Sequence, residues 1–247
     1  MMKLENGFRT SACMRIDELT GPKFEELGPR LAFLPVGSVE RHGDHLPLGT
    51  DTIIAEHLAR ELASRTNGIL LPTIPYGPCI ALRDYPGTFD VDWEALYRYV
   101  LSVLREAARN GLKKVVIVNG HGGNTNVLKF AARRASIEHD MQIVVFDWWR
   151  DVAQDVRKEL FPHPGHAGED ETSVLLAIRP DLADMDRADA NEAPHPTLSL
   201  YSPSTYREVF VKPLIGDARK ADPERGRKLL DAVIEEVLDF LREWKMI

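Results

Sequence analysis

The sequence predicts an α/β fold in which a mainly parallel sheet is covered by helices on both faces. Short apolar runs alternate along the chain with longer amphipathic stretches, and this alternation is typical of βαβ units. The short runs are apolar throughout, as expected of parallel strands that are buried on both sides. With 247 residues, the chain is near the upper limit for one hydrophobic core, so we expect a single domain over residues 1–247.

Four apolar runs are the expected strands. The first ends directly at Gly37, and the third, Lys114–Val118, is the clearest because it is β-branched throughout after its lysine. The second is followed by Pro75-Tyr-Gly-Pro78, which ends any regular element. In chain order, the runs cover residues 31–36, 69–74, 114–118 and 141–146.

The helices are predicted from apolar residues that recur every three or four positions. Ile54, Leu58 and Leu62 recur at such a spacing and form one face of a helix, and Asn110-Gly111 ends the next one. In chain order, the predicted helices cover residues 51–65, 92–109, a stretch after 124 that ends near 139, 171–178 and 224–244.

Residues 180–213 depart from this alternation. They contain several prolines and serines, among them Pro194, Pro196, Ser199, Ser202 and Pro203. We interpret them as an irregular excursion from the domain, a lid or an oligomer contact rather than a linker.

Composition excludes several classes of function. Acidic residues outnumber basic ones, 38 to 31, for a formal net charge of −7, so neither nucleic acid nor an anionic membrane is an expected partner. No apolar run reaches the roughly 20 residues of a transmembrane helix, and the first residues lack a signal-peptide core, which predicts a cytoplasmic protein. The two cysteines, Cys13 and Cys79, are too few for a disulfide framework or a cysteine-type zinc site.

The segment from Gly37 to Asp51 is the richest in residue types that bind metals. It leaves a predicted strand at its carboxyl end, where open α/β sheets form their sites. Glu40 and His42 are two positions apart, so in extended backbone they project to the same side. Asp51 stands at a predicted helix start, where its carboxylate can cap the backbone or bind a metal.

A second segment, Asn119–Asn124, also follows a strand and exposes His121 between glycines. Glycine-rich turns at helix starts bind anions, which is a rival interpretation. The segment nevertheless lacks the Lys-Ser/Thr ending of a P-loop and the spacing of a dinucleotide-binding turn.

The third segment, His166–Ser173, offers His166, Glu169 and Glu171 at the entrance to a helix. Acidic residues in a first helical turn are also favoured by the helix dipole alone. Three segments that each bring a histidine to a strand end or helix start, two of them rich in carboxylates, together favour a metal site. Histidine and carboxylate ligands suit zinc, manganese or iron(II), and two such ions can activate a water for hydrolysis.

These motifs resemble the creatininase family. The resemblance rests on GSVERHGDHLPLGTD at 37–51, YPGTFD at 85–90, NGHGGN at 119–124 and HAGEDETS at 166–173, and it covers roughly residues 25 to 180. It implies a three-layer α/β/α sandwich and a hydrolase that cleaves a C–N bond in a cyclic amide or formamide. The resemblance also implies two divalent metal ions per chain, zinc first, with manganese and iron as alternatives.

The resemblance implies particular roles for the motif residues. Its metal ligands would be Glu40, His42, Asp51 as the bridging group, and His121. The family's next ligand, a glutamate, corresponds to Gly123 here, and Glu169 of the HAGE motif is the expected replacement. His166 and Glu171 are the expected catalytic residues. His166 would transfer a proton to the leaving nitrogen. Glu171 belongs to the recurring ET pair, which could also begin the helix or support the metal ligands.

The resemblance further implies a small-molecule substrate attacked by a metal-bridging hydroxide, and a homo-oligomer, a hexamer in family members. Creatinine itself is doubtful as the substrate, because a tryptophan that holds it in creatininase corresponds to Pro162. Two alternatives stay open: ring opening of a cyclic diketone such as an oxidised inositol, and a non-catalytic member that binds a sugar phosphate or another anion at the turn over 120–123.

Overall fold

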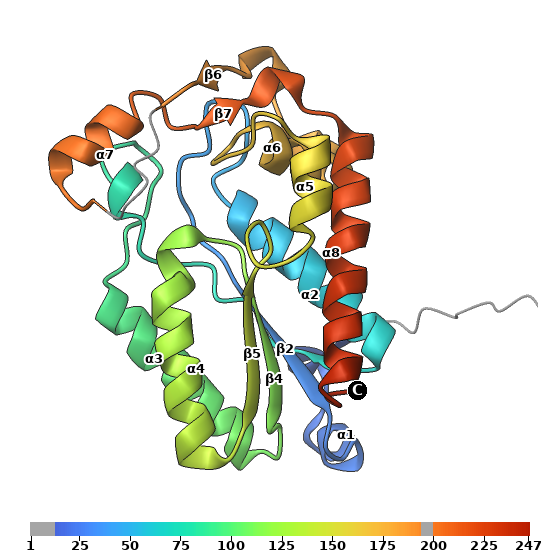
Figure 1. Cartoon of the computed structure of the whole chain (residues 1–247). Helices are drawn as coiled ribbons and strands as arrows, with labels where there is room; N and C mark the ends of the chain where they lie inside the picture. Colours follow the sequence, from blue (N-terminus) through green and yellow to red (C-terminus); the bar gives the residue numbers. More distant parts are fainter. Residues whose placement is uncertain (1–12, 194–199) are drawn as a thin grey trace, which may run out of the picture.

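The computed structural model describes residues 13–193 and 200–247. Its main sheet has five strands in the order β1-β3-β2-β4-β5, and every pairing in it is parallel. The strands are β1 (Met14–Arg15), β2 (Leu31–Val36), β3 (Ile69–Leu70), β4 (Lys114–Asn119) and β5 (Gln142–Asp147). The predicted α/β class with a mainly parallel sheet is therefore confirmed (Figure 1).

Helices cover both faces of the sheet and make three layers (Figure 1). Phe33 and Val116 pack with α2 (Thr50–Thr66) and α8 (Pro223–Glu243) in one buried cluster. Their neighbours Leu34 and Ile117 pack with α3 (Trp93–Arg109) and α4 (Thr125–His139) in another. Successive residues of a strand point to opposite faces, so the apolar runs β2 and β4 supply both cores.

The five predicted helices and three of the four predicted strands lie close to their predicted ranges as α2, α3, α4, α6 (Glu169–Ile178), α8, β2, β4 and β5, and the second predicted strand is shorter. The apolar run over 69–74 forms a strand only at Ile69–Leu70, and Ile74 adds a single bridge to Val36. Pro72 explains the break, because a proline has no N–H to donate to a neighbouring strand.

The remaining elements lie mainly around the two ends of the sheet. They are η1 (Ile16–Glu18), α1 (Gly21–Glu26), η2 (Ile80–Leu82), η3 (Gly122–Asn124), α5 (Gln154–Leu160), η4 (Pro180–Leu182), η5 (Met185–Arg187), β6 (Ala190–Asn191), α7 (Pro203–Val209), β7 (Gly216–Asp217) and η6 (Ala218–Lys220). In the expected excursion over 180–213, residues 194–199 lie outside the described part. Its described residues include short 3-10 turns, helix α7 and strand β6, which pairs antiparallel with β7. Among the described residues, no helix is long and apolar enough to cross a membrane.

Register in the sheet places the motif segments together. Val36, Asn119 and Asp147 are aligned at the carboxyl ends of β2, β4 and β5. The segment that begins at Gly37 and the turn that carries His121 therefore leave the sheet side by side. Helices α5, α6 and α7 lie beyond this same end of the sheet (Figure 1).

Candidate metal centre

Asp51 is shared between two groups of buried ligand atoms. Its Oδ1 atom lies 3.0 Å from Nε2 of His42, and its Oδ2 atom lies 3.0 Å from Nδ1 of His121. The carboxylate sits in the first turn of α2 and is 2% exposed. Ser38 Oγ donates to Oδ2 at 2.7 Å, which holds the carboxylate in this orientation. One carboxylate that faces two histidines through different oxygens is the geometry of a bridging ligand.

Each group is completed by a glutamate. Glu40 Oε1 lies 3.1 Å from His121 Nδ1, and Glu171 Oε2 lies 3.5 Å from His42 Nε2. Ligand atoms of His42, Asp51 and Glu171 all lie within 4.8 Å of one another. Both glutamates are buried, so the two groups lie inside the protein rather than on a solvated acidic surface.

Backbone carbonyls orient the rings of the two ligand histidines, because each carbonyl accepts a hydrogen bond from one ring nitrogen. Nδ1 of His42 donates to the carbonyl of Glu40 at 3.1 Å, and Nε2 of His121 donates to the carbonyl of Pro78 at 2.7 Å. A carbonyl can only accept, so the proton is fixed on the outward nitrogen of each ring. The inward nitrogens are thereby left to face the carboxylates, as metal-ligating histidines are commonly oriented.

The charges in the cluster are strongly perturbed. Burial lowers the pKa of His42, but Asp51 and Glu171 outweigh burial and raise it to about 10. Burial raises the pKa of Glu171 to about 8, against the opposing effect of His42. In His121, the carboxylates of Glu40 and Asp51 likewise overcome burial and raise the pKa well above its usual value. Buried carboxylates that hold protons on neighbouring histidines fit a site built for cations.

The three consecutive acids of α6 have different partners. Glu169 Oε1 accepts from Arg225 Nη1 at 2.7 Å, and Asp170 Oδ2 accepts from Arg157 Nε at 2.7 Å. Glu171 has no such arginine among the described residues and faces His42 and Asp51 instead.

The structure therefore does not bring Glu169 into either ligand group, contrary to the expectation from the sequence. Its negative charge is already neutralised by the guanidinium of Arg225, and its second oxygen accepts from the backbone N–H of His163 at 3.0 Å. Glu171, expected at the catalytic centre but not as a ligand, takes the place beside His42.

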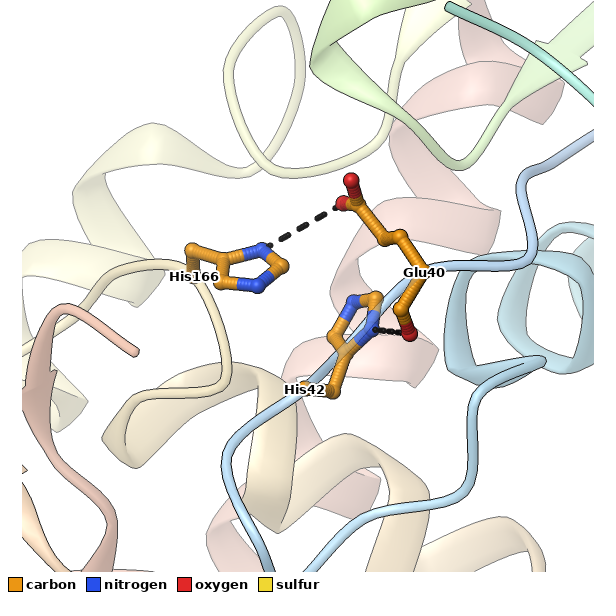
Figure 2. A group of neighbouring side chains, drawn as sticks. All are labelled: Glu40, His42 and His166. Carbon is orange, nitrogen blue, oxygen red and sulfur yellow. Dashed lines mark hydrogen bonds and ion pairs between the residues drawn. The ribbon is translucent and has the colours of Figure 1, made fainter. Parts of the chain in front are cut away.

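His166 lies against the cluster, and Figure 2 shows its ring beside Glu40 and His42. Its Nδ1 is 3.6 Å from Glu40 Oε1, its Nε2 donates to the carbonyl of Arg41 at 2.9 Å, and its ring centroid is 4.3 Å from that of His42. Burial, together with the charge on His42, lowers the pKa of His166 to about 4. The ring is therefore neutral at pH 7, with a free electron pair on Nδ1 directed toward the cluster.

The glycines of the second motif are explained by close packing. A Cβ at Gly123 would lie 2.0 Å from the carbonyl oxygen of Pro78, and one at Gly120 would lie 2.2 Å from that of Asp51. Position 123, which corresponds to a glutamate in the creatininase motif, therefore has no room for a side chain in this protein. Close approach of chain segments accounts for these glycines without an anion cradle.

Sequence reasoning assigned no site role to three groups at the cluster. Cys79 places Sγ 3.7 Å from His121 Nε2, and Glu40, Cys79 and His121 form a further group of ligand types. Ser38 and the carbonyl of Pro78 hold Asp51 and His121. No local pattern marks Cys79 or Pro78, because their roles depend on a contact with a distant segment, whereas Ser38 lies inside the first motif.

A cavity of about 760 Å³ opens onto the cluster. Glu40, Asp51, His121, His166 and Glu171 lie in its wall, and so do aromatic and cationic side chains from other elements: Trp148, Trp149, Arg150, Arg157, Tyr201, Tyr206 and Phe210. Phe210 meets the edge of His166 at a centroid distance of 5.8 Å. The part of the excursion around α7 thus forms one wall of the cavity.

The layers and the cluster define a class of protein, an α/β/α fold with a buried candidate centre for divalent cations at the carboxyl end of its parallel sheet. The sequence profile of the Creatininase family, described as creatinine amidohydrolase, matches residues 17–241. The chain belongs to this family, which confirms the resemblance seen in the motifs.

Curated relatives have different substrates. The chain is 29% identical over 261 residues to the creatinine amidohydrolase of Pseudomonas putida, with 92% of this chain and 96% of the relative covered. It is 34% identical over 225 residues to the mycofactocin precursor peptide peptidase of Mycobacterium ulcerans, with 85% and 84% covered. It is 30% identical over 228 residues to the 2-amino-5-formylamino-6-ribosylaminopyrimidin-4(3H)-one 5'-monophosphate deformylase of Methanothermobacter thermautotrophicus, with 87% and 89% covered.

Solved structures agree with the fold. A crystal structure of creatinine amidohydrolase superimposes with a TM-score of 0.85 at 27% identity, covering 94% of this chain and 98% of that one. A manganese form of creatininase superimposes with a TM-score of 0.84 at 28% identity, covering 93% and 98%. These findings confirm the expected family and the expected creatininase-like hydrolase fold.

Proposed function

We propose that this hydrolase cleaves an amide C–N bond with the help of two divalent cations, zinc first. One cation would be held by Glu40, Asp51 and His121, and the other by His42, Asp51 and Glu171. The observation that carries the proposal is that the two oxygens of the Asp51 carboxylate face different histidines, each at 3.0 Å from a ring nitrogen. Support for divalent metals comes from the manganese form of a related creatininase.

Cations held in this way supply an activated water and electrostatic stabilisation for an oxyanion. The residues of the chain do the rest. His166 Nδ1 has no hydrogen-bond donor role in the neutral ring, so it accepts a proton on the cluster side and returns it to the leaving nitrogen. The carbonyl of Arg41 keeps the ring in that tautomer. Phe210 and the aromatic wall give the cavity an apolar side next to His166.

For the substrate, we propose a formamide of a planar aromatic or heteroaromatic amine. Support comes from the cavity, which at about 760 Å³ is in the size range of drug-sized ligands and is much larger than a single small ring needs. Its tryptophans and tyrosines offer flat apolar surface, and the deformylase relative acts on a formylamino group of a pyrimidinone. Pro162 is absent from the cavity wall, so the family's tryptophan has no counterpart at that position.

The quaternary structure also stays a proposal. We propose a homo-oligomer, on the resemblance alone, and the cytoplasmic location stays an expectation from the sequence. Light scattering coupled to size-exclusion chromatography measures the mass against the 27.8 kDa chain.

Elemental mass spectrometry of the purified protein and of Asp51→Ala tests the metal proposal. About two divalent ions per chain are expected in the parent, and none or nearly none in the variant, because the bridging carboxylate serves both positions. A parent that stays metal-free after incubation with zinc, manganese and iron(II) would contradict the proposal and favour the anion-binding alternative.

Substrate choice is tested with three probes: 4-nitroformanilide, creatinine and a cyclic 1,3-diketone. Release of 4-nitroaniline is expected, with little turnover of creatinine. Turnover of the diketone alone would favour the ring-opening alternative.

A further inference from the structure

The loop before α6 is attached to the helix by three consecutive carboxylates. Glu169 accepts from the backbone N–H of His163 at 3.0 Å, Asp170 from Gly165 at 2.9 Å, and Glu171 from Ala167 at 2.5 Å. The bonded amides are two residues apart along the loop, and His166 lies between the last two. The position of the His166 ring therefore depends on how these acids are held.

Glu169 is held from the C-terminal helix. Arg225, in the first turn of α8, donates to Glu169 Oε1 at 2.7 Å and to the carbonyl of Leu160 at 2.7 Å. Its guanidinium also lies 5.3 Å from the ring centroid of Phe161. One side chain thus contacts both the end of α5 and the acid that holds His163. The segment that leads to His166 is fixed at its beginning by α8.

The loop needs such support because its backbone is strained. Ala167 has a φ of 49°, in the left-handed region that disfavours residues with a side chain. The carbonyl of its neighbour His166 accepts from the backbone N–H of Ile215 at 2.7 Å. A strained backbone conformation that is held by hydrogen bonds to neighbouring segments relaxes when one of these anchors is removed.

We propose that Arg225 and Glu169 are positioning residues for His166. They act through the loop, which they hold so that Nδ1 of His166 faces the cluster and its ring lies against His42. The consequence for catalysis rests on the proposed function. The positional claim does not, because it concerns only side chains and backbone of this chain. This also gives Glu169 a role other than that of a metal ligand.

Reaction of His166 with diethyl pyrocarbonate, followed residue by residue by mass spectrometry, tests the positional claim. The full chain is compared, metal-free and zinc-loaded, with Glu169→Gln and Arg225→Lys. The glutamine keeps the size of Glu169 and loses the charge, whereas the lysine keeps the charge and loses the second guanidinium nitrogen, which donates to the carbonyl of Lys220. We expect His166 to react several-fold faster in Glu169→Gln, less so in Arg225→Lys, with His139 unchanged as the internal standard. Equal rates for His166 in all three proteins would overturn the proposal.

Metal content separates positioning from ligation. Glu169→Gln is expected to bind as much zinc as the parent, and loss of zinc in this variant would make Glu169 a ligand and refute its positioning role. Arg227→Gln is the matched control, because Arg227 lies two residues further along α8 and, within the described part of the chain, pairs only with exposed Glu224. It should leave the reactivity, the metal content and the turnover unchanged.

A double-mutant cycle, measured with 4-nitroformanilide, tests whether Glu169 affects turnover through His166. Glu169→Gln alone is expected to lower kcat by about 10- to 100-fold, since small displacements of a reacting group have effects of this size, with KM nearly constant. In the His166→Ala background the same change should cost almost nothing, because the residue that it positions is gone. Additive losses would refute action through His166.

Failure of the proposed function would leave a different pattern. If the parent bound no metal and hydrolysed no probe, the pyrocarbonate rates would still report whether Arg225 and Glu169 hold His166. If the parent were active and those rates were equal, only the positioning proposal would fail.

Discussion

The carboxylate of Glu171 lies 3.5 Å from Nε2 of His42, although the two residues are far apart in the chain. Helix α6 thereby supplies a carboxylate to a group that otherwise comes from the loop after β2 and the start of α2. In the second motif, the position that corresponds to the creatininase glutamate is Gly123, and it is packed against Pro78. The candidate centre is thus completed from α6 rather than from the turn after β4.

Replacing Glu171 by glutamine is expected to remove about one of the two cations, because His42 and Asp51 would be left as the only ligands at that position. Elemental mass spectrometry measures the loss. A double variant that adds Gly123→Glu should not restore the ion, since a Cβ at 123 would lie 2.0 Å from the Pro78 oxygen. Full metal content in Glu171→Gln would contradict the assignment of this ligand.

Removal of the His166 ring is expected to slow hydrolysis of 4-nitroformanilide by about 10²–10⁴-fold, the usual contribution of a positioned acid–base group. The metal content should stay at the parent value, because His166 is not among the proposed ligands. Steady-state kinetics beside elemental analysis of His166→Ala checks both expectations. A fully active variant, or one without metal, would show that the role of His166 is different.

Metal binding is expected to release protons and to become tighter as pH rises. In the metal-free protein, Asp51 and Glu171 outweigh burial and hold the pKa of His42 at about 10, while burial holds that of Glu171 at about 8. Below these values both groups carry a proton that competes with the cation, so raising the pH from about 6 to about 8 strengthens binding. Calorimetric titration with zinc in two buffers of different ionisation enthalpy counts the protons. Affinity that is independent of pH would contradict the expected competition.

Gly123→Ala is expected to destabilise the protein by about 1–3 kcal/mol, as overpacking does. The new methyl group would meet the carbonyl of Pro78 at 2.0 Å and Nε2 of His121 at 2.6 Å, so zinc affinity should fall as well. Gly122→Ala is the matched control, because the nearest heavy atom there is 3.9 Å away, on Trp149. Thermal unfolding of both variants measures the difference in stability. Equal midpoint temperatures would contradict the prediction and show that the backbone at 123 moves easily.

Much of the fold could be predicted from sequence because it depends on local patterns. The apolar runs that became β2, β4 and β5, and the periodic stretches that became α2, α3, α4 and α8, are marked by spacing within a few residues. The shorter β3 follows from a single proline. For residues 180–213 the sequence left a lid and an oligomer contact open, because their composition does not determine where they pack; residues around α7 line the cavity through tertiary contacts.

The sequence by itself determined the family, the layered fold and most of the candidate ligands, because these depend on motifs and periodicity along the chain. Only the tertiary structure decided which acid of α6 faces the cluster. Residues two apart on a helix point in directions about 200° apart, so Glu169 and Glu171 cannot both face His42. The rotation of α6 is set by its packing, which directs Glu169 to Arg225 of α8 and leaves Glu171 for the centre. Contacts between segments that are distant in the chain thus decide the role of each acid, which the local sequence does not.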